Sequence, residues 1–337
     1  MTVHILSNIP ISGFDNYMLD LESLLAKSVI STDPNITEVA SHLINAGGKR
    51  IRPALAIAAA ASAGIDANTS ILLSGVSVEL VHLASLYHDD VMDDALQRRN
   101  VPSVNSKWSN LIAIVVGDFL LAKAAGIAAR LGQNTAQLLA DTLGLLCEGQ
   151  ILEVNATYDS NRTVDHYLDA ISGKTASLMA TSCKIGALVA NTDESLALDL
   201  ERIGYLFGIT YQIRDDILDI VATFEELGKA PAQDLAEGVY TLPIIIALAD
   251  EPKGSDLRKF LERNSRDLQN ESELEFVRSK IITSGAIEKS LAIARGYADE
   301  ASAIGSGIGN PVAEFLGLMS SKLLDDVEAT FEKRTAL

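Results

Sequence analysis

Residues 71–94 read ILLSGVSVELVHLASLYHDDVMDD, an apolar run that ends in a group of carboxylates. Within the run, Val78, Val81, Leu83 and Leu86 recur at helical spacing, and there is no proline. A segment of this length and apolarity predicts a buried helix with an acidic end. The stretch therefore indicates both a helical fold and the place where polar chemistry enters it.

The rest of the chain repeats this helical pattern. Residues 103–230 contain no proline and are rich in alanine and leucine, whereas alternating Val/Ile/Thr runs and Asn-Gly hairpin signals are scarce. The chain is therefore predicted to be all-α, with an irregular N-terminal segment at 1–16 and loops at 157–162 and 226–238. No linker divides it, so residues 1–337 are expected to form one domain. Helices are expected near 17–31, 35–46, 53–63, 67–98, 108–131, 134–156, 164–190, 195–223, 241–249, 255–263, 272–283, 285–304 and 310–333.

Composition and charge narrow the classes of function. The 337 residues are 48% hydrophobic and carry a formal net charge of −18. Such an acidic surface repels phosphate backbones, so nucleic acid is not expected as a partner. Two cysteines build no disulfide framework, and the N-terminus lacks the basic residues of a signal peptide, so a cytoplasmic location is expected. The apolar stretch 111–131 is interrupted by Asp118, Lys123 and Arg130, which predicts a buried helix and no transmembrane segment.

Two acidic clusters share the form D-D-x-x-D, one within HDDVMD (88–93) and one within RDDILD (214–219). On a helix, positions i and i+4 share a face and i+1 is nearby, so the three carboxylates converge on one rim. One such cluster is more typical of a solvated helix face, but two with the same spacing among apolar residues favour cation binding. Because Mg²⁺ prefers a few carboxylates together with phosphate oxygens, facing clusters predict a diphosphate site. The candidate metal ligands are Asp89, Asp90, Asp93, Asp215, Asp216 and Asp219.

Basic residues are grouped around these clusters. The segment GGKRIRP (47–53) places three cations at a turn that enters a helix, which is a favourable anion site. Arg98 and Arg99 follow the first cluster, and Lys174 and Lys229 lie next to glycines. Each of these cations alone is more typical of a surface salt bridge. In a chain of net charge −18, the group as a whole predicts two separate phosphate pockets.

Seven segments in this order resemble the trans-isoprenyl diphosphate synthases of the polyprenyl synthetase family. They are GGKRIRP (47–53), LVHLASLYHDDVMDDALQRR (80–99), GDFLL (117–121), GQILE (149–153), GKTASL (173–178), YQIRDDILD (211–219) and LGKAPAQDLAEGVYTLP (227–243). The resemblance covers roughly residues 20–330. It implies a single large bundle of antiparallel helices around a deep central cavity, with both acidic clusters at its mouth, and a homodimer.

The resemblance also implies a reaction, in which an allylic diphosphate ionises and the double bond of isopentenyl diphosphate attacks the resulting cation. The six aspartates would carry Mg²⁺, three ions per active site, and these would clamp the allylic diphosphate. The cations implied for that same diphosphate are Arg98, Lys174 and Lys229. The residues implied for isopentenyl diphosphate are Lys49, Arg52, His82 and Arg99. Thr175 and Gln212 match residues whose oxygens stabilise the developing cation.

Small side chains at one wall of the implied product tunnel predict a long product. Ala84 and Ser85 lie one turn before the first cluster and would point down the tunnel, and Val81 lies deeper. Bulky aromatic residues there would close the tunnel. A long-chain product (hexaprenyl to decaprenyl) is therefore predicted, with geranylgeranyl diphosphate as the alternative if another helix supplies the floor.

Two positions depart from the family pattern. Ala232 stands where a second glycine is common, and Val239 stands where a lysine is common, which removes one possible phosphate contact. These two departures predict either weaker substrate binding or a subgroup difference, although the complete clusters predict activity.

Two other functions are compatible with the helical fold and the acidic clusters. One is a terpene cyclase, which usually has an Asn/Ser/Glu metal site in place of the second cluster. The other is a catalytically silent partner subunit of a heteromeric synthase.

Overall fold

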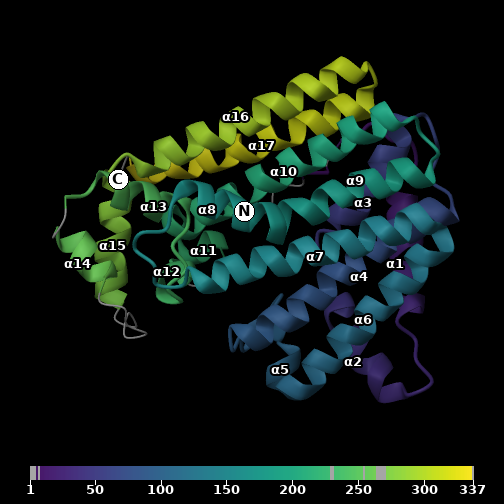
Figure 1. Cartoon of the computed structure of the whole chain (residues 1–337), viewed down its shortest axis with the longest axis horizontal. Helices are drawn as coiled ribbons and strands as arrows, with labels where there is room; N and C mark the ends of the chain where they lie inside the picture. Colours follow the sequence, from purple (N-terminus) through teal and green to yellow (C-terminus); the bar gives the residue numbers. More distant parts are fainter. Residues whose placement is uncertain (1–4, 7, 228–230, 253–254, 263–270, 336–337) are drawn as a thin grey trace.

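The computed structural model describes residues 5–6, 8–227, 231–252, 255–262 and 271–335, which form helices joined by short loops (Figure 1). The first half contains α1 (Phe14–Ser28), α2 (Pro34–Asn45), α3 (Ile51–Ser62), α4 (Thr69–Met92), β1 (Gln97–Arg98), β2 (Val101–Pro102), α5 (Val104–Lys107), α6 (Asn110–Leu131) and α7 (Gln133–Asn155). The second half contains α8 (Val164–Ile171), the π-helical turn η1 (Ser172–Ala176), α9 (Ser177–Val189), α10 (Glu194–Val221), α11 (Phe224–Leu227), α12 (Gln233–Ala236), α13 (Leu242–Asp250), α14 (Asp256–Leu261), α15 (Glu271–Thr283), α16 (Ala286–Ile308) and α17 (Pro311–Thr335). The all-α expectation is confirmed.

Side-chain caps start the helices that matter for the site. Asn68 accepts hydrogen bonds from the backbone N–H groups of Ser70 and Ile71 at the start of α4. Asp193 accepts one from Leu196 at the start of α10. Each cap satisfies N–H groups that no helical carbonyl can reach, so it determines where the helix begins. The acidic clusters lie at the opposite ends of these two helices.

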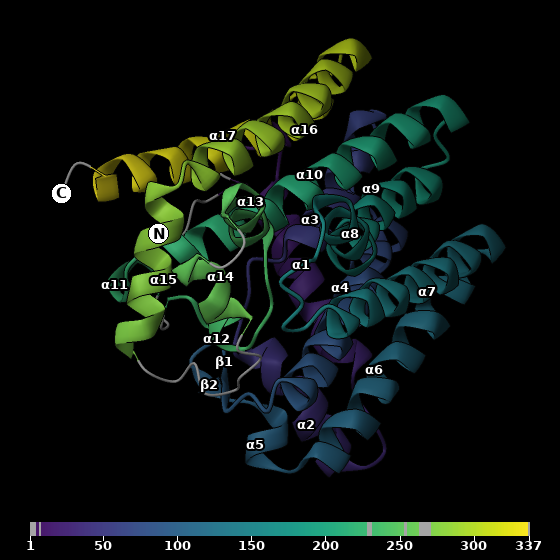
Figure 2. The ribbon, with the colours of Figure 1, turned by 60° about the vertical axis from the view of Figure 1, so that its left-hand side comes forward.

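The centre of the bundle is formed by α4 and α10. Helix α4 packs against α1, α3, α6 and α9, and α10 packs against α9, α16 and α17. Figures 1 and 2 show the α16–α17 pair lying along α10, with α6 and α7 on the other side of the bundle. Phe207 of α10 belongs to a hydrophobic cluster with the first helices, and Ile213 belongs to a second cluster with α13 to α17. Helix α10 therefore joins the two parts of the core.

Among the residues that the structure describes, two helices are long and apolar enough to cross a membrane by length and composition alone. In α4, 67% of the most apolar 18-residue stretch is buried, as in the core helix of a globular protein. In α6 the buried share is 39%, although this helix is the more apolar of the two. Much of the apolar surface of α6 is therefore left uncovered in a single chain.

Close packing of α3 on α9 depends on Gly186, where an added Cβ would lie 2.1 Å from the carbonyl oxygen of Ala56. We expect Gly186→Ala to lower the free energy of unfolding by about 1–3 kcal/mol, because the two helices must separate. Gly296 in α16 faces open space, so Gly296→Ala is expected to raise it by about 0.5–1 kcal/mol. Urea unfolding followed by circular dichroism measures both changes, and equal effects would contradict the close approach.

The helix expected at 67–98 is wrong beyond Met92. The chain leaves the helix there, and Asp94 adopts a left-handed φ of +49°. Strands β1 and β2 then form a hairpin that turns at Arg99 (φ +54°) and Asn100 (φ +62°). Two central residues with positive φ are what a tight type I′ hairpin turn requires. Neither residue is a glycine, so the sequence lacks the usual signal for such a turn.

Three other boundaries differ from expectation. The helix expected at 164–190 is interrupted by η1, a five-residue π-helical segment in which the backbone hydrogen bonds span five residues instead of four. The irregular N-terminal segment is shorter than 1–16, since α1 begins at Phe14. The loop expected at 226–238 contains α12 and the end of α11.

Candidate active site

The first acidic cluster lies at the end of α4, and its three carboxylates have different surroundings. Asp93 is exposed and Asp89 is half-buried, whereas Asp90 is fully buried. Asp90 Oδ1 accepts a hydrogen bond from Arg98 Nε at 2.8 Å and lies 2.6 Å from Arg98 Nη2. The β1–β2 hairpin therefore returns Arg98 onto the cluster, where it pairs with Asp90 and leaves Asp89 and Asp93 accessible.

The second cluster lies in the last turns of α10. Asp215 is half-buried, with Arg214 Nη1 2.6 Å from its Oδ1. Asp216 is buried, and its two oxygens accept hydrogen bonds from the Tyr167 hydroxyl at 2.5 Å and from Gln212 Nε2 at 2.8 Å. Asp215 is therefore the accessible carboxylate of this pair, and Asp216 is held from two sides.

Asp219 connects the second cluster to the segment around Ala232, the position where a second glycine is common in the family. The backbone carbonyl of Asp219 accepts from Ala232 N at 2.8 Å, and its Oδ2 accepts from Asp234 N at 3.3 Å. Ala232 adopts a φ of +58°, a left-handed conformation that costs a residue with a Cβ about 1–2 kcal/mol. This backbone conformation explains in physical terms why glycine suits position 232.

Lys174 and Glu153 lie between the two clusters, and Lys174 Nζ donates a hydrogen bond to Glu153 Oε1. Burial raises the pKa of Asp89 to about 6; the charges of Asp93 and Glu153 add to this rise, and that of Lys174 opposes it. The pKa of Asp216 is also raised, mainly by burial and in part by Glu153. Because Glu153 acts on carboxylates of both clusters, the two clusters surround one centre.

The π-helical turn η1 presents Thr175, one of the two residues expected to stabilise a cation, and the other, Gln212, lies on α10. The turn approaches α7 closely at Gly149, where an added Cβ would lie 2.3 Å from Lys174 N. Thr175 is buried, and its hydroxyl donates a hydrogen bond to Gln212 Oε1 at 2.9 Å. The structure thus brings these two oxygens together from different helices, beside the second cluster. Single π turns often occur at functional sites.

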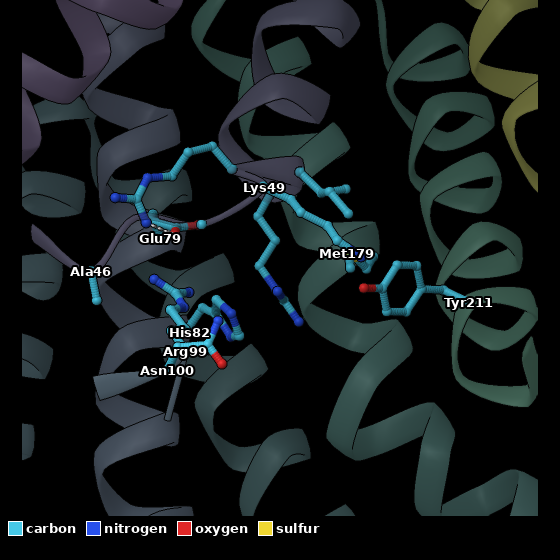
Figure 3. Close-up of a pocket in the computed structure, with 12 residues that line it drawn as sticks. Ala46, Lys49, Glu79, His82, Arg99, Asn100, Met179 and Tyr211 are labelled. Carbon is cyan, nitrogen blue, oxygen red and sulfur yellow. Dashed lines mark hydrogen bonds and ion pairs between the residues drawn. The ribbon is translucent and has the colours of Figure 1, made fainter. Parts of the chain in front are cut away.

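A basic pocket of ≈ 390 Å³ lies between α3, α4, α9 and α10 (Figure 3). The four residues implied for isopentenyl diphosphate all line it: Lys49, Arg52, His82 and Arg99. Figure 3 shows the Tyr211 hydroxyl pointing from α10 toward the same space. Lys49 Nζ lies 5.9 Å from the centre of the Tyr211 ring. A compact pocket lined by cations fits a diphosphate group.

His82 contributes a neutral ring to this pocket. Burial lowers its pKa well below the ordinary value, and the charges of Arg52 and Arg99 lower it further. At neutral pH it therefore offers a ligand hydrogen bonds but no charge. Arg99 reaches the pocket through the hairpin and donates to the Gly47 carbonyl. The same hairpin delivers Arg98 to the acidic cluster and its neighbour Arg99 to the basic pocket.

Arg50 and Glu79 also line this pocket, and the sequence did not predict that Arg50 is paired with Glu79 and, outside the pocket lining, with Glu22. Arg50 is buried with a left-handed φ of +48°, and its Nη1 donates to Glu79 Oε1 at 3.0 Å. Its Nε donates to Glu22 Oε1 at 2.6 Å. Arg50 is therefore compensated by carboxylates, unlike Lys49 beside it. A signal was available, since Glu79 is the only Asp, Glu, Lys or Arg in residues 69–88, and a buried charge requires a partner.

The acidic clusters fit a divalent metal that is shared with phosphate. In the described ranges, no three His, Cys, Asp or Glu side chains are gathered closely enough to hold a metal by themselves. Accessible carboxylate oxygens come from Asp89, Asp93 and Asp215, and the buried Asp90 Oδ2 has no hydrogen-bond partner within the described chain. Mg²⁺ usually keeps water and phosphate oxygens in its coordination shell, so two partial ligand sets on facing helices suit it.

The remaining expected residues are placed as follows. Lys229 lies outside the described residues. Val81 and Ala84 are buried in α4, and the Ser85 hydroxyl donates to the His82 carbonyl at 2.9 Å. Val239 is half-buried, and its N–H donates to the Asp234 carbonyl at 2.8 Å. The effects of these positions on product length and substrate binding stay predictions.

Comparison with known proteins supports the same assignment. The chain is 37% identical over 242 residues to the nonaprenyl diphosphate synthase of Mycobacterium tuberculosis, which covers 72% of each chain. It is 38% identical over 300 residues to the heptaprenyl diphosphate synthase component 2 of Geobacillus stearothermophilus, covering 89% of this chain and 91% of that one. The solved polyprenyl synthase of Caulobacter crescentus, complexed with calcium and isoprenyl diphosphate, superposes with a TM-score of 0.86 at 33% identity. That match covers 92% of this chain and 94% of the other.

The polyprenyl synthetase family itself matches residues 33–279. This range contains both acidic clusters, the GGKRIRP segment and the π-helical turn. The resemblance inferred from seven short segments is thereby confirmed over most of the chain. The chain belongs to the polyprenyl synthetase family, the prenyl transferases that make polyprenyl diphosphates.

Proposed function

We propose that this chain is a Mg²⁺-dependent prenyltransferase that joins isopentenyl diphosphate to an allylic diphosphate and makes a linear all-trans polyprenyl diphosphate. One observation carries the proposal: the Lys174–Glu153 pair lies close to carboxylates of both acidic clusters, Asp89 in the first and Asp216 in the second, while a separate basic pocket holds Lys49, Arg52 and Arg99. Two substrates that both carry diphosphates need two sites, and the sites here differ in charge. The acidic site needs metal ions to hold its substrate, and the basic site does not.

The acidic site would bind the allylic diphosphate beside Arg98, Lys174 and Lys229. The accessible carboxylates of Asp89, Asp93 and Asp215 would hold Mg²⁺, three ions per site, and the buried Asp90, Asp216 and Asp219 complete the set. Bound Mg²⁺ would stabilise the negative charge of the leaving diphosphate. Thr175 and Gln212 would direct their oxygens at the allylic carbon, where positive charge develops.

The reaction then balances without a side-chain base. The allylic C–O bond breaks, and its electron pair leaves with the diphosphate. The double bond of isopentenyl diphosphate, held in the basic pocket, forms the new C–C bond to the cation. The proton lost in the last step goes to the departing diphosphate. The role of the chain is to hold two substrates in line and to keep the cation near oxygen dipoles.

The names of two of the similar proteins and the small residues in α4 support a long-chain product. The two curated relatives above are named nonaprenyl diphosphate synthase and heptaprenyl diphosphate synthase component 2. The small side chains of Ala84, Ser85 and Val81 on α4 would leave room for a growing chain next to the first cluster. We therefore propose a product of hexaprenyl to decaprenyl length. Geranylgeranyl diphosphate is the alternative product, if another helix supplies the tunnel floor.

The test is a product analysis with purified protein, Mg²⁺ and labelled isopentenyl diphosphate. Dimethylallyl, geranyl, farnesyl and geranylgeranyl diphosphates are each offered as primer, and chain length is determined by mass spectrometry. A ladder that ends at hexaprenyl or longer supports the whole proposal. A stop at geranylgeranyl keeps the reaction and rejects the long product. Bound isopentenyl diphosphate without elongation indicates a silent partner subunit.

Two alternatives are weaker on specific grounds. A terpene cyclase usually replaces the second cluster with an Asn/Ser/Glu site, but this chain keeps Asp215, Asp216 and Asp219 together with the basic pocket. A silent subunit tends to lose acidic residues, and both clusters are complete.

We also propose that residues 1–337 form one domain, since α10 contributes to both hydrophobic clusters. A cytoplasmic location suits the acidic chain and its two free cysteines.

The exposed sides of α6 and α7 support a second copy of the chain as partner. Leu111 is 69% exposed and Val115 54% exposed in α6, and Ile151 is 60% exposed in α7. Gly126 and Gly144 on the same two helices face open space, so another helix could approach closely there. An apolar surface of this kind is typical of a subunit interface. We propose a homodimer through α6 and α7.

Val115→Glu is expected to weaken the dimer by on the order of 100-fold, because an unpaired charge would be buried at its centre. Light scattering after size exclusion should show twice 35.9 kDa for the native chain and a shift toward 35.9 kDa for the variant. Leu198→Glu, at an exposed leucine of α10, is the matched control and should stay dimeric. A native chain that is monomeric, and active only with a second kind of subunit, would reject the homodimer in favour of a heteromer.

A further inference from the structure

Arg162, in the loop between α7 and α8, has no part in the reaction described above, yet its environment is unusual. The residue is 6% exposed, and its Nη1 donates to the Tyr240 carbonyl at 3.0 Å. Its Nε and Nη2 are buried, and neither has a hydrogen-bond partner in the described ranges. Buried polar groups are nearly always bonded, because they lose water on burial. Two unbonded N–H groups on one guanidinium therefore indicate a task other than packing.

The first task follows from the contacts of Tyr167. The Arg162 guanidinium lies over the Tyr167 ring, 5.5 Å from its centre. Tyr167 is fully buried, and its hydroxyl donates to Asp216 Oδ2 at 2.5 Å. The other oxygen of Asp216 accepts from Gln212, which in turn accepts from Thr175. Arg162 thus lies at the start of a line of contacts that ends at the cation-facing oxygens.

The second task concerns the segment after the late loop. Tyr158 N donates to the Gly238 carbonyl at 2.8 Å, and an added Cβ on Gly238 would lie 2.3 Å from the Tyr158 ring. Together with the bond from Arg162 to Tyr240, these contacts join the loop after α7 to the segment between α12 and α13 (Figure 1). The hydrogen bond from Asp234 N connects the same segment to Asp219.

We propose that Arg162 is a positioning residue of the second acidic cluster. Through Tyr167 it holds Asp216, and through Tyr240 it holds the segment bonded to Asp219, in the arrangement that binds Mg²⁺ together with a diphosphate. The positive guanidinium against one face of the phenol ring keeps the hydroxyl directed at Asp216. The inference rests on the proposed function, because it assumes that this cluster holds metal.

Arg162→Gln keeps an amide donor for the Tyr240 carbonyl but removes the charge. Calorimetric titration of the protein with inorganic pyrophosphate and Mg²⁺ measures binding without turnover. We expect affinity to fall about 10-fold or more, which is the usual effect of losing a residue that orients a metal ligand. The Mg²⁺ concentration for half-maximal activity should rise by a similar factor. The KM for isopentenyl diphosphate should stay unchanged, since none of the contacts above reaches the basic pocket.

Two further variants separate positioning from stability. Arg258→Gln is the matched control, since Arg258, on α14, donates to the Leu248 carbonyl at 2.6 Å and has a buried unbonded Nε. It should leave pyrophosphate binding unchanged. Tyr167→Phe keeps the ring and removes only the hydroxyl, and it should weaken binding as Arg162→Gln does.

Each result decides the inference. Arg162→Gln with native affinity for Mg²⁺ and pyrophosphate overturns it. If Arg162→Gln does not fold, Arg162→Lys and Tyr167→Phe decide. Native affinity in Tyr167→Phe overturns the inference, whereas reduced affinity in Tyr167→Phe, with an affinity of Arg162→Lys between that of Tyr167→Phe and that of the native protein, supports it. A native protein that binds no Mg²⁺ and pyrophosphate overturns the proposed function as well, whereas native binding with unaffected variants overturns only the role of Arg162.

Discussion

Asp89→Ala is expected to reduce kcat/KM by about 10³-fold or more while the helical circular-dichroism signal stays unchanged. Asp89 is an accessible carboxylate of the first cluster, beside Lys174. A metal contact in the transition state lowers the activation free energy by several kcal/mol. Each change of about 1.4 kcal/mol in activation free energy corresponds to a factor of ten in rate. Asp215→Ala on the facing helix should have an effect of the same order, because it removes a ligand from the other side of the same centre.

Stability measurements make this prediction sharper. Burial raises the pKa of Asp89 to about 6, so the ionised group is disfavoured in the folded protein without a ligand. Its removal should therefore leave thermal stability equal or slightly higher, in contrast to the loss of activity. Asp299→Ala, which removes an exposed carboxylate from α16, is the control and should change neither. Native activity in both Asp89→Ala and Asp215→Ala would refute the metal site.

Ala84→Phe is expected to shorten the product from hexaprenyl or longer to roughly farnesyl or geranylgeranyl length. Position 84 lies one helical turn before Asp89, on the helix that would form one tunnel wall. An aromatic ring there would occupy the space into which the growing chain extends. Mass spectrometry of the products, with the same primer for both proteins, measures the shift directly.

The control for this change must separate a blocked tunnel from a strained core. Ala84 is fully buried, and a larger side chain in a packed core costs about 1–3 kcal/mol of stability. Ala294→Phe makes the same change at a fully buried position of α16, away from α4. It should lower the melting temperature and leave product length unaltered. An unchanged product in a folded Ala84→Phe protein would place the tunnel floor on another helix.

Long helices were predictable because their signals are local. Apolar spacing and the absence of proline placed helices at 108–131 and 195–223, and α6 and α10 lie within two residues of these bounds. The end of α4 was not predictable in this way. The turn after Met92 uses left-handed residues that are not glycine, and Asp90 draws Arg98 back onto the cluster. A turn that depends on such a contact has no local pattern.

The candidate site also has features that the sequence predicted and features that it did not. The clusters at Asp89–Asp93 and Asp215–Asp219 could be identified because three carboxylates at fixed helical spacing share a rim wherever the helix lies. The π-helical turn that carries Lys174 and Thr175 could not be identified, since it lies against Gly149 of another helix and no local spacing signals that contact. The buried Glu79 was visible as a lone charge in an apolar run, but its partner Arg50 was not distinguishable from the ligand-binding cations beside it.

From its amino-acid pattern alone, this protein is predicted to be helical, to carry two carboxylate clusters suited to metal, and to hold cations suited to diphosphates. The pairing of individual arginines is visible only in the folded chain. Arg98 pairs with Asp90, Arg50 pairs with Glu79, and Arg162 reaches Tyr240, 78 residues away. The physical reason is that spacing along a helix depends on a few neighbouring residues, whereas charge pairing depends on distances that only chain packing creates. An arginine that binds substrate and one that holds the fold have the same letter in the sequence.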